Sequence, residues 1–250
     1  MHFFQIDNSC FARRIMLYYE LLLIYCLSEA DTDMKVEMHT HTSETSPCAH
    51  ICAQDVIKMY KEARYDTVVI TDHYSKWVFE KNGAKTPDEV TSHFLKGYKT
   101  ALGCAETYDI NVLLGCEVTL TESPNDYLLY GVNEDFFHTH PFLYNLSLEE
   151  LSEICHNENI LIVQAHPNRA YCEPVNPALL DGAEVFNDSN NDKTYAWAYE
   201  HDLIMTSGSD FHEKEDLALG GIITEYDIKT ENDLIQTLLS GDYSLITPVE

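Results

Sequence analysis

The stretch Val36-Glu-Met-His-Thr-His-Thr42 reads as a short apolar strand that ends in two histidines, His39 and His41. In an extended strand, residues two positions apart point to the same side. Two imidazoles on one side of a strand end can hold one metal ion. An isolated His-x-His pair is, however, more often a chance surface feature. The metal-binding interpretation therefore depends on whether other strand ends supply matching ligands.

The composition is that of a globular protein with a sizeable core. The chain has 250 residues, of which 45% are hydrophobic and 11% aromatic, and its mean hydropathy is -0.25. This length favours a single large α/β domain. The formal net charge of -27 argues against long-range attraction to a nucleic-acid backbone or to an anionic membrane. Bound divalent metals would still attract a small anion, because they invert the local field.

The cysteines indicate a reducing environment. The chain has 8 cysteines, and none of them forms a Cys-x-x-Cys pair. A chain of this length does not need disulfides for stability, so we expect buried free thiols in a reducing compartment, the cytoplasm. Cys48 and Cys52 follow the histidine pair closely in the sequence, and contact with a metal ion is the alternative for these two.

Residues 1–33 differ in character from the rest of the chain. Two arginines precede an apolar run, residues 15–27, that is too short to span a membrane and has Glu20 at its centre. A signal peptide has the same order of parts, but Glu20 argues against one. We expect an N-terminal extension of uncertain role, either an added amphipathic helix or a segment before a natural start at Met34. A single domain over residues 34–250 follows it.

From Met34 onward, short apolar runs alternate with segments of helical periodicity. Residues 53–63 have apolar side chains at helical spacing, and capping boxes open further helices at Thr86, Ser147 and Thr230. Strands interleaved with helices in this way predict a barrel-like α/β fold. The expected strands are residues 35–38, 67–71, 112–116, 127–131, 160–165, 183–186, 203–207 and 221–224.

Side chains that can bind metals fall at the ends of most of these strands. In α/β barrels the chemistry lies where the strands end. Imidazole together with carboxylate suits Zn, Mn or Fe, and so many ligands exceed what one ion can bind. We therefore expect two or three divalent metal ions bridged by a carboxylate, an arrangement that serves phosphoester hydrolysis. The polar residues at the strand ends are His39, His41, Asp72, His73, Glu117, His166, Arg169, Glu184, Asn187, Asp210 and His212.

Five motifs follow one another along the chain: His39-Thr-His41, Thr71-Asp-His73, Gly115-Cys-Glu117, Ala165-His-Pro167 and Ser207-Gly-Ser-Asp-Phe-His212. In their order and spacing they resemble the motifs of the PHP (polymerase and histidinol phosphatase) superfamily. The resemblance extends from Met34 to about Ile223. It implies a distorted (β/α)7 barrel, similar to a TIM barrel, with a trinuclear metal site and phosphoesterase activity.

The resemblance also implies which residues hold each ion. Carried over motif by motif, the ligands are His39, His41, Glu117 and Asp210 for the first ion, Glu117 and His166 for the second, and His73 and His212 for the third.

The chain departs from the family pattern at two places. Many members have a histidine after the fourth strand, where this chain has Asn133. We therefore expect the second ion to be bound more weakly or to complete its shell with water. For the third ion, the early loop supplies Glu44 as the expected additional ligand. The alternative is that Glu44 is an exposed loop acid.

The predicted function is a metal-dependent phosphoesterase that hydrolyses a small phosphomonoester through a metal-bridging hydroxide. Arg169 is expected to clamp the substrate phosphate, with an ordinary surface arginine as the alternative. Asn187 is expected to contact the substrate or to orient a ligand. Asp210 or His212 is expected to protonate the leaving group. Trp77 either stacks on a base or packs within the protein.

Two other functions stay open. One is a nuclease or phosphodiesterase that acts on short oligonucleotide ends, since the acidic chain does not suit long nucleic acid. The other is a metal-binding regulatory module without turnover, although ligands at nearly every strand end argue against a loss of activity. The expected partner is a small phosphorylated substrate, with no membrane partner. The sequence does not predict an oligomeric state.

Overall fold

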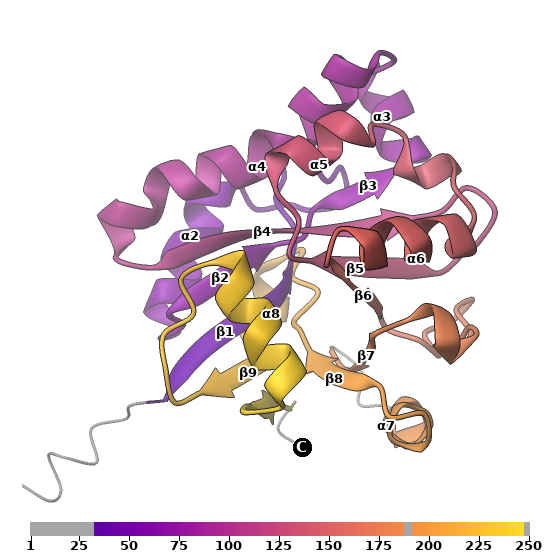
Figure 1. Cartoon of the computed structure of the whole chain (residues 1–250). Coiled ribbons are helices and arrows are strands. Elements are labelled where there is room, and N and C mark those ends of the chain that lie inside the picture. The colour runs from indigo at the N-terminus through magenta and orange to yellow at the C-terminus, as the bar shows by residue number, and fades with distance from the viewer. Residues whose placement is uncertain (1–32, 188–191, 248–250) are drawn as a thin grey trace, which may run out of the picture. The chain divides into compact units, whose positions relative to one another are not determined.

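The computed structural model describes residues 33–187 and 192–247. From Met34 onward the chain forms one compact α/β unit around a ten-stranded sheet (Figure 1). The expectations for residues 1–32 lie outside the described residues. Among the residues that are described, no helix is long and apolar enough to cross a membrane.

The strands follow one another around the sheet in nearly the order in which they occur in the chain. Hydrogen-bonded neighbours run in the order β10-β9-β1-β2-β4-β5-β6-β7-β8, and β3 pairs with the end of β4. The strands are β1 (Met34–Thr40), β2 (Thr67–Ile70), β3 (His73–Ser75), β4 (Asn111–Thr119), β5 (Asp126–Tyr130), β6 (Leu161–Gln164), β7 (Gly182–Phe186), β8 (Ile204–Ser207), β9 (Gly221–Thr224) and β10 (Ser244–Ile246). The eight expected strands are all present, and β3 and β10, each of three residues, were not predicted.

The barrel itself consists of β1, β2 and β4 to β8. Its strands are parallel except for β5, which is antiparallel to both of its neighbours. After β8 the chain returns to β1, where Phe211 forms a parallel bridge with Thr40 and its carbonyl accepts the N–H of His41 at 3.0 Å. The sheet is therefore nearly closed. This architecture confirms the predicted distorted (β/α)7 barrel, and the reversed β5 is part of its distortion.

Most of the helices lie on the outer side of the sheet, whereas α8 lies across one end of the barrel (Figure 1). The capping boxes predicted at Thr86, Ser147 and Thr230 are all present, and each opens a helix. The short helices α3 and α5 were not predicted, because so few residues show little periodicity. The α-helices are α2 (Ala53–Glu62), α3 (Lys76–Asn82), α4 (Pro87–Tyr108), α5 (Glu134–Thr139), α6 (Leu148–Asn157), α7 (Asp192–Glu200) and α8 (Glu231–Ser240).

Apolar side chains pack on both faces of the sheet, which explains the continuous apolar runs of the strands. Within the barrel, Val36, Leu128 and Val163 pack together with Leu234 of α8. Ile235 of α8 lies close to Gly131, the residue that follows β5. Because β5 is antiparallel, Gly131 lies at the opposite end of the barrel from the carboxyl ends of β4 and β6. Helix α8 therefore packs at that opposite end and leaves the carboxyl rim accessible.

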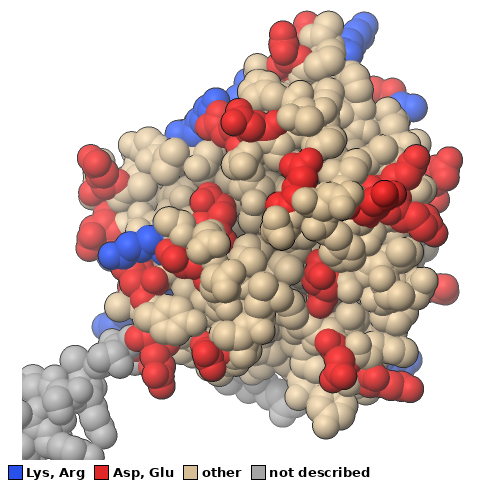
Figure 2. All heavy atoms as spheres, in the orientation of Figure 1, with Lys and Arg blue, Asp and Glu red and all other residues tan. Residues whose placement is uncertain are grey.

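The surface is strongly acidic. Asp and Glu side chains are spread over the whole face shown in Figure 2, whereas Lys and Arg are few on it. This distribution follows from 42 acidic against 15 basic residues. The face therefore offers no continuous basic strip that would follow a nucleic-acid backbone.

Candidate metal centre

An irregularity near the end of β1 brings both histidines of the pair to the rim. The register between β1 and β2 shifts after Glu37. Met38 packs in the barrel interior, and the next residue, His39, also faces inward, onto carboxylates at the rim. The carboxylate of Glu37 accepts the N–H groups of Met38 and His39 at 3.0 and 2.9 Å, so it satisfies donors at the irregular step. The rings of His39 and His41 lie 5.0 Å apart, on the same side as their spacing predicts.

Glu117, near the end of β4, lies at the centre of the cluster and is fully buried. Its Oε1 lies 3.2 Å from Nε2 of His39 and 3.0 Å from Nε2 of His166. Its Oε2 lies 3.4 Å from Nε2 of His41 and 2.6 Å from Nδ1 of His73. A single carboxylate thus faces imidazoles on two sides, which is the position of a ligand that bridges two ions.

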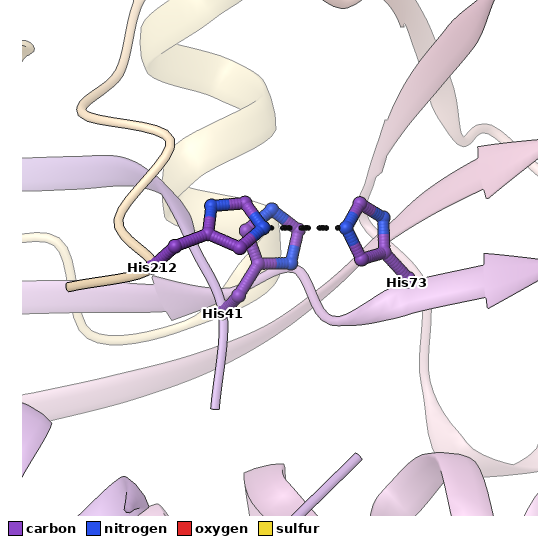
Figure 3. Close-up of side chains that lie close together, drawn as sticks. All are labelled: His41, His73 and His212. Carbon is purple, nitrogen blue, oxygen red and sulfur yellow. Dashed lines mark hydrogen bonds between the residues drawn. The ribbon is translucent and has the colours of Figure 1, made fainter. Parts of the chain in front are cut away.

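Three imidazoles converge on one side of Glu117. Figure 3 shows the rings of His41, His73 and His212, and the Nε2 atoms of His73 and His212 are 3.4 Å apart. Nδ1 of His212 donates to the backbone carbonyl of Asp210 at 2.8 Å. Because Nδ1 is engaged by the carbonyl, Nε2, which faces His73, is the nitrogen left to bind an ion. These three side chains form a group that can hold an ion.

Asp126 completes a second group on the other side of Glu117, and sequence analysis missed it. Its Oδ2 lies 3.9 Å from Nε2 of His166, and both join Glu117 in a group that can hold an ion. Because β5 is antiparallel, its first residue, Asp126, lies at the rim, whereas its last does not. Asn133 lies beyond the other end of β5 and caps α5 by accepting the N–H of Phe136 at 2.9 Å. The sequence signal that could have identified Asp126 is an acidic residue at the start of a strand.

Asp210 reaches the cluster from the segment after β8. Its Oδ1 lies 3.1 Å from Nε2 of His41 and 3.3 Å from Nε2 of His39. The φ angles of Asp210 and His166 are 50° and 30°, values that residues other than glycine seldom adopt and that are found at functional sites. The guanidinium of Arg169 lies 2.6 Å from Oδ2 of Asp210. The structure therefore brings Arg169 to the edge of the cluster.

Glu184 holds two of the histidines from behind. Its Oε1 accepts Nδ1–H of His39 at 2.9 Å, and its Oε2 accepts the backbone N–H of His166 at 3.0 Å. Oε2 also accepts the side-chain amide of Asn187 at 3.1 Å. Asn187 is 3% exposed, so its position favours the expected orienting role over a contact with substrate. Sequence analysis placed Glu184 at a strand end but gave it no role.

Asp72 acts on the cluster through its neighbours. It accepts the N–H and the hydroxyl of Thr42, each at 2.7 Å, and the hydroxyl of Ser46 at 2.6 Å. The Ser46 hydroxyl in turn lies 3.4 Å from Nδ1 of His41. Asp72 therefore fixes the loop after β1 against the strand end that carries His73.

Glu44 lies outside these groups, and the expectation that it binds the third ion is not met in this structure. Both of its carboxylate oxygens accept the N–H of Ala53, at 3.1 and 2.9 Å, at the start of α2. There the carboxylate satisfies a helix donor and interacts favourably with the helix dipole. Cys48 comes from the same loop. Burial alone would raise the pKa of its thiol, but interactions with His212 and His73 lower it to about 6.

Charged side chains of the cluster strongly shift one another's pKa values. Burial alone would lower the pKa of His39, but the charge of Glu184 and of the other nearby carboxylates raises this pKa well above its usual value. Burial alone would raise the pKa of Glu117, but charged histidines lower it far more. Burial and two neighbouring histidines lower the pKa of His41 well below its usual value. Ionised carboxylates are thus concentrated where a cation would bind.

The residues fit divalent metal ions. Nε2 of His39 is a buried atom without a hydrogen-bond partner. Such an unpaired group costs about 1–3 kcal/mol, a cost that a coordinated metal ion removes. Imidazole and carboxylate are donors that Zn, Mn and Fe accept. Four groups of three side chains can hold an ion among the described residues: His41, His73 and His212; His39, His41 and Glu117; His39, His166 and Asp210; and Glu117, Asp126 and His166.

A cavity of about 630 Å³ adjoins the cluster. His73 and Asp126 belong to its wall, so the cavity opens directly onto the metal-binding groups. Trp77 also lines it and is 54% exposed, whereas the neighbouring Phe79 is 1% exposed and packs in the core. The rest of the polar wall consists of four residues with hydroxyl groups, Ser75, Thr119, Thr121 and Ser123, and of Lys76 and Glu80.

The fold and the cluster together define an α/β barrel whose carboxyl rim carries side chains able to bind metal ions. Residues 37–239 match the PHP domain family, and the chain belongs to this family. The matched region begins in β1 and ends in α8, so it includes every group of the centre. The comparison with curated proteins found no match to the chain.

Solved structures resemble the chain in fold. A two-domain protein from Bacteroides vulgatus that contains a predicted PHP-like metal-dependent phosphoesterase has a TM-score of 0.65 at 12% identity; the match covers 86% of this chain and 65% of that one. PsfC from Pseudomonas syringae has a TM-score of 0.56 at 14% identity, and the match covers 81% of this chain and 88% of that one. A candidate metal-dependent phosphoesterase from Bifidobacterium adolescentis has a TM-score of 0.53 at 16% identity, and the match covers 82% of this chain and 95% of that one. This chain thus spans about two thirds of the Bacteroides protein.

Proposed function

We propose that the protein is a metal-dependent phosphoesterase that hydrolyses a small phosphomonoester, with two or three divalent ions at the barrel rim. The observation that carries this proposal is the position of Glu117. Its two oxygens face His39 and His166 on one side and His41 and His73 on the other. A carboxylate in this position can join two ions a few ångströms apart, the arrangement suited to displacement at phosphorus.

Bound ions would supply charge neutralisation for the phosphate and an activated water as nucleophile. The ligand groups of His39, His41, Asp210, His166, Asp126 and Glu117 would hold them, with His73 and His212 at a further site. The protein residues would do the rest. Arg169, now 2.6 Å from Asp210, would bind a phosphate oxygen at the edge of the cluster. His212, 23% exposed, could donate a proton to the leaving oxygen, as proposed from its sequence position, only where its Nε2 does not bind an ion, because metal ligation competes with proton donation.

The cavity beside His73 favours the proposal that the substrate is small and carries a planar ring. Phosphate bound at the centre would direct its leaving group into this space, where the exposed face of Trp77 offers a stacking surface. Hydroxyl groups of the wall would bind polar atoms of the same group. The acidic surface in Figure 2 argues against long nucleic acid, so a short oligonucleotide end is the largest phosphodiester that we consider.

The test is turnover of a panel of phosphomonoesters by metal-stripped protein reloaded with Zn or Mn, compared with a dinucleotide as phosphodiester. We expect phosphate release from monoesters that disappears on chelation and returns with metal. Asp210→Ala should remove most of this activity, whereas Asp242→Ala, at an exposed position, should keep it.

Three results would count against the proposal. Turnover that persists in metal-free protein would exclude a metal-dependent mechanism. Activity on the dinucleotide alone would favour the phosphodiesterase. Metal binding without turnover of any ester would favour a regulatory module.

The cytoplasm stays our proposal for the compartment, because the six described cysteines are all free thiols.

A further inference from the structure

The loop between β1 and α2 places a thiol beside His73 and His212. We propose that Cys48 is a ligand of the divalent ion held by these two histidines, and that its thiolate makes this site favour zinc or iron over manganese. The inference rests on the metal dependence proposed above. It deepens that proposal by giving Cys48 the role that the sequence assigned to Glu44.

Hydrogen bonds on both sides of Cys48 fix its position. The backbone N–H of His73 donates to the hydroxyl of Ser46 at 3.0 Å. The N–H of His50 donates to the carbonyl of His212 at 2.8 Å. The loop is thus tied, two residues before and two residues after Cys48, to the chain segments that carry the histidines. Its thiol accordingly interacts with both imidazoles.

The atoms around the thiol form a suitable donor set. Nε2 of His212 lies 3.4 Å from Nε2 of His73 and is not engaged by the carbonyl, which Nδ1 contacts. Nδ1 of His73 lies 2.6 Å from Oε2 of Glu117, so Nε2 is the nitrogen of His73 left for an ion. His41 also belongs to the group with His39 and Glu117. With His41 on that neighbouring ion, two imidazole nitrogens and one thiolate leave one position open in a tetrahedral shell. That is the composition of catalytic zinc sites, where water or substrate takes the fourth position.

Other side chains of the loop do not compete for this place. Glu44 would have to give up the N–H of Ala53, which it accepts with both oxygens. Cys52 points elsewhere, because its thiol donates to Asp55 of α2 at 3.4 Å. A thiolate is a softer donor than a carboxylate, so exchanging one for the other changes which ion is preferred. The identity of residue 48 therefore sets the metal preference of this site.

Cobalt spectroscopy of the full chain tests the ligand directly. Metal-stripped protein is titrated with Co²⁺, and thiolate-to-cobalt charge transfer is recorded in the near ultraviolet. We expect this absorption in the wild-type protein and in Cys52→Ser, the matched control from the same loop. Cys48→Ser should lack the charge-transfer absorption but keep the weaker visible bands of cobalt bound by histidine and carboxylate. Far-ultraviolet circular dichroism checks that each variant is folded.

Metal competition tests the preference. Cys48→Asp replaces the thiolate with an oxygen donor, so the ratio of Zn affinity to Mn affinity should fall by at least about tenfold. Even residues that only hydrogen-bond to a metal ligand change metal affinity by about this factor, and a direct ligand should change it at least as much. Elemental analysis of Cys48→Ser should show the loss of up to one equivalent of zinc. Cys48→Asp also serves as the second variant if Cys48→Ser does not fold.

Both readouts are independent of turnover. Charge transfer that is absent in the wild type, or that persists in Cys48→Ser, would overturn the proposal even if the protein hydrolyses phosphomonoesters. An unchanged Zn to Mn ratio in Cys48→Asp would do the same. Conversely, the predicted spectrum in a protein without phosphatase activity would support Cys48 as a ligand and would refute only the proposed function.

Discussion

Nδ1 of His39 donates to Oε1 of Glu184 at 2.9 Å, a bond between residues 145 positions apart in the chain. It holds a proton on Nδ1 of His39, so that Nε2, which faces Glu117 and Asp210, is the nitrogen left to bind a metal ion. The other oxygen of Glu184 accepts the backbone N–H of His166 at 3.0 Å. One buried carboxylate therefore orients two imidazoles that belong to different metal-binding groups.

Removing this support should weaken metal binding. Hydrogen-bond partners behind metal ligands typically account for about 10- to 100-fold in metal affinity. We expect a loss of this size for Glu184→Ala and a smaller one for Glu184→Gln, whose amide oxygen can still accept from His39. Competition with a coloured chelator measures the affinity. Glu200→Ala, on the exposed side of α7, is the control, and equal affinities for Glu184→Ala and Glu200→Ala would contradict the role.

Two glycines of α4 should respond oppositely to the same substitution. A Cβ at Gly97 would lie 2.0 Å from the hydroxyl of Thr42 and 2.2 Å from Oδ2 of Asp72, whereas a Cβ at Gly103 would have no neighbour within 4 Å. Gly97→Ala should therefore cost about 1–3 kcal/mol of stability by overpacking. Gly103→Ala should add up to about 1 kcal/mol through helix propensity. Urea unfolding measures both, and equal shifts would exclude the close packing of α4 on the loop after β1.

Glu37 should make stability fall as the pH rises. Burial raises its pKa from 4.5 to about 7, although hydrogen bonds from Ser209 and His39 oppose the shift. The folded state therefore binds more protons than the unfolded state between these values, and the contribution of Glu37 to stability decreases across this window. At about 1.4 kcal/mol per unit of pKa, the decrease is at most roughly 3 kcal/mol.

Glu37→Gln isolates this effect. Its amide oxygen can accept the N–H groups of Met38, His39 and Ser209, while its NH₂ group donates to the Ser209 hydroxyl. Between pH 4.5 and pH 7, the free energy of unfolding of the variant should rise relative to that of the wild type, and above pH 7 the difference should be constant. Parallel pH profiles of the two metal-free proteins would show that Glu37 titrates normally.

Trp77 should select substrates with a planar ring. Stacking of a base on an aromatic side chain is worth about 1–3 kcal/mol, which corresponds to roughly 5- to 160-fold. Trp77→Ala should lower kcat/KM for a nucleoside monophosphate by such a factor and leave glycerol phosphate unaffected. Trp77→Phe, which keeps a ring, should retain most of the selectivity. An equal loss for both substrates would mean that Trp77 supports the fold of the cavity wall, where Lys81 lies 4.8 Å above its ring.

The sequence by itself determined the barrel and most of the centre. Apolar runs of strand length and three capping boxes are local patterns, and the structure contains the elements that they predict. Seven residues lie at or just beyond the carboxyl ends of parallel barrel strands, so their convergence at one rim follows from strand direction. They are His39, His41, His73, Glu117, His166, Asp210 and His212.

Tertiary structure decided the remaining members of the centre, because their roles depend on non-local geometry. The reversal of β5 places Asp126 at the rim and Asn133 at the opposite end, and no local pattern marks a strand as antiparallel. Glu44 and Cys48 come from one loop, yet only the packing of α2 decides which of them is directed to a helix end and which to the histidines. Likewise, the closure of the barrel brings Glu184 of β7 within hydrogen-bond distance of His39 of β1. Short-range periodicity sets the strands and their ends, whereas contacts between distant segments set where each side chain points.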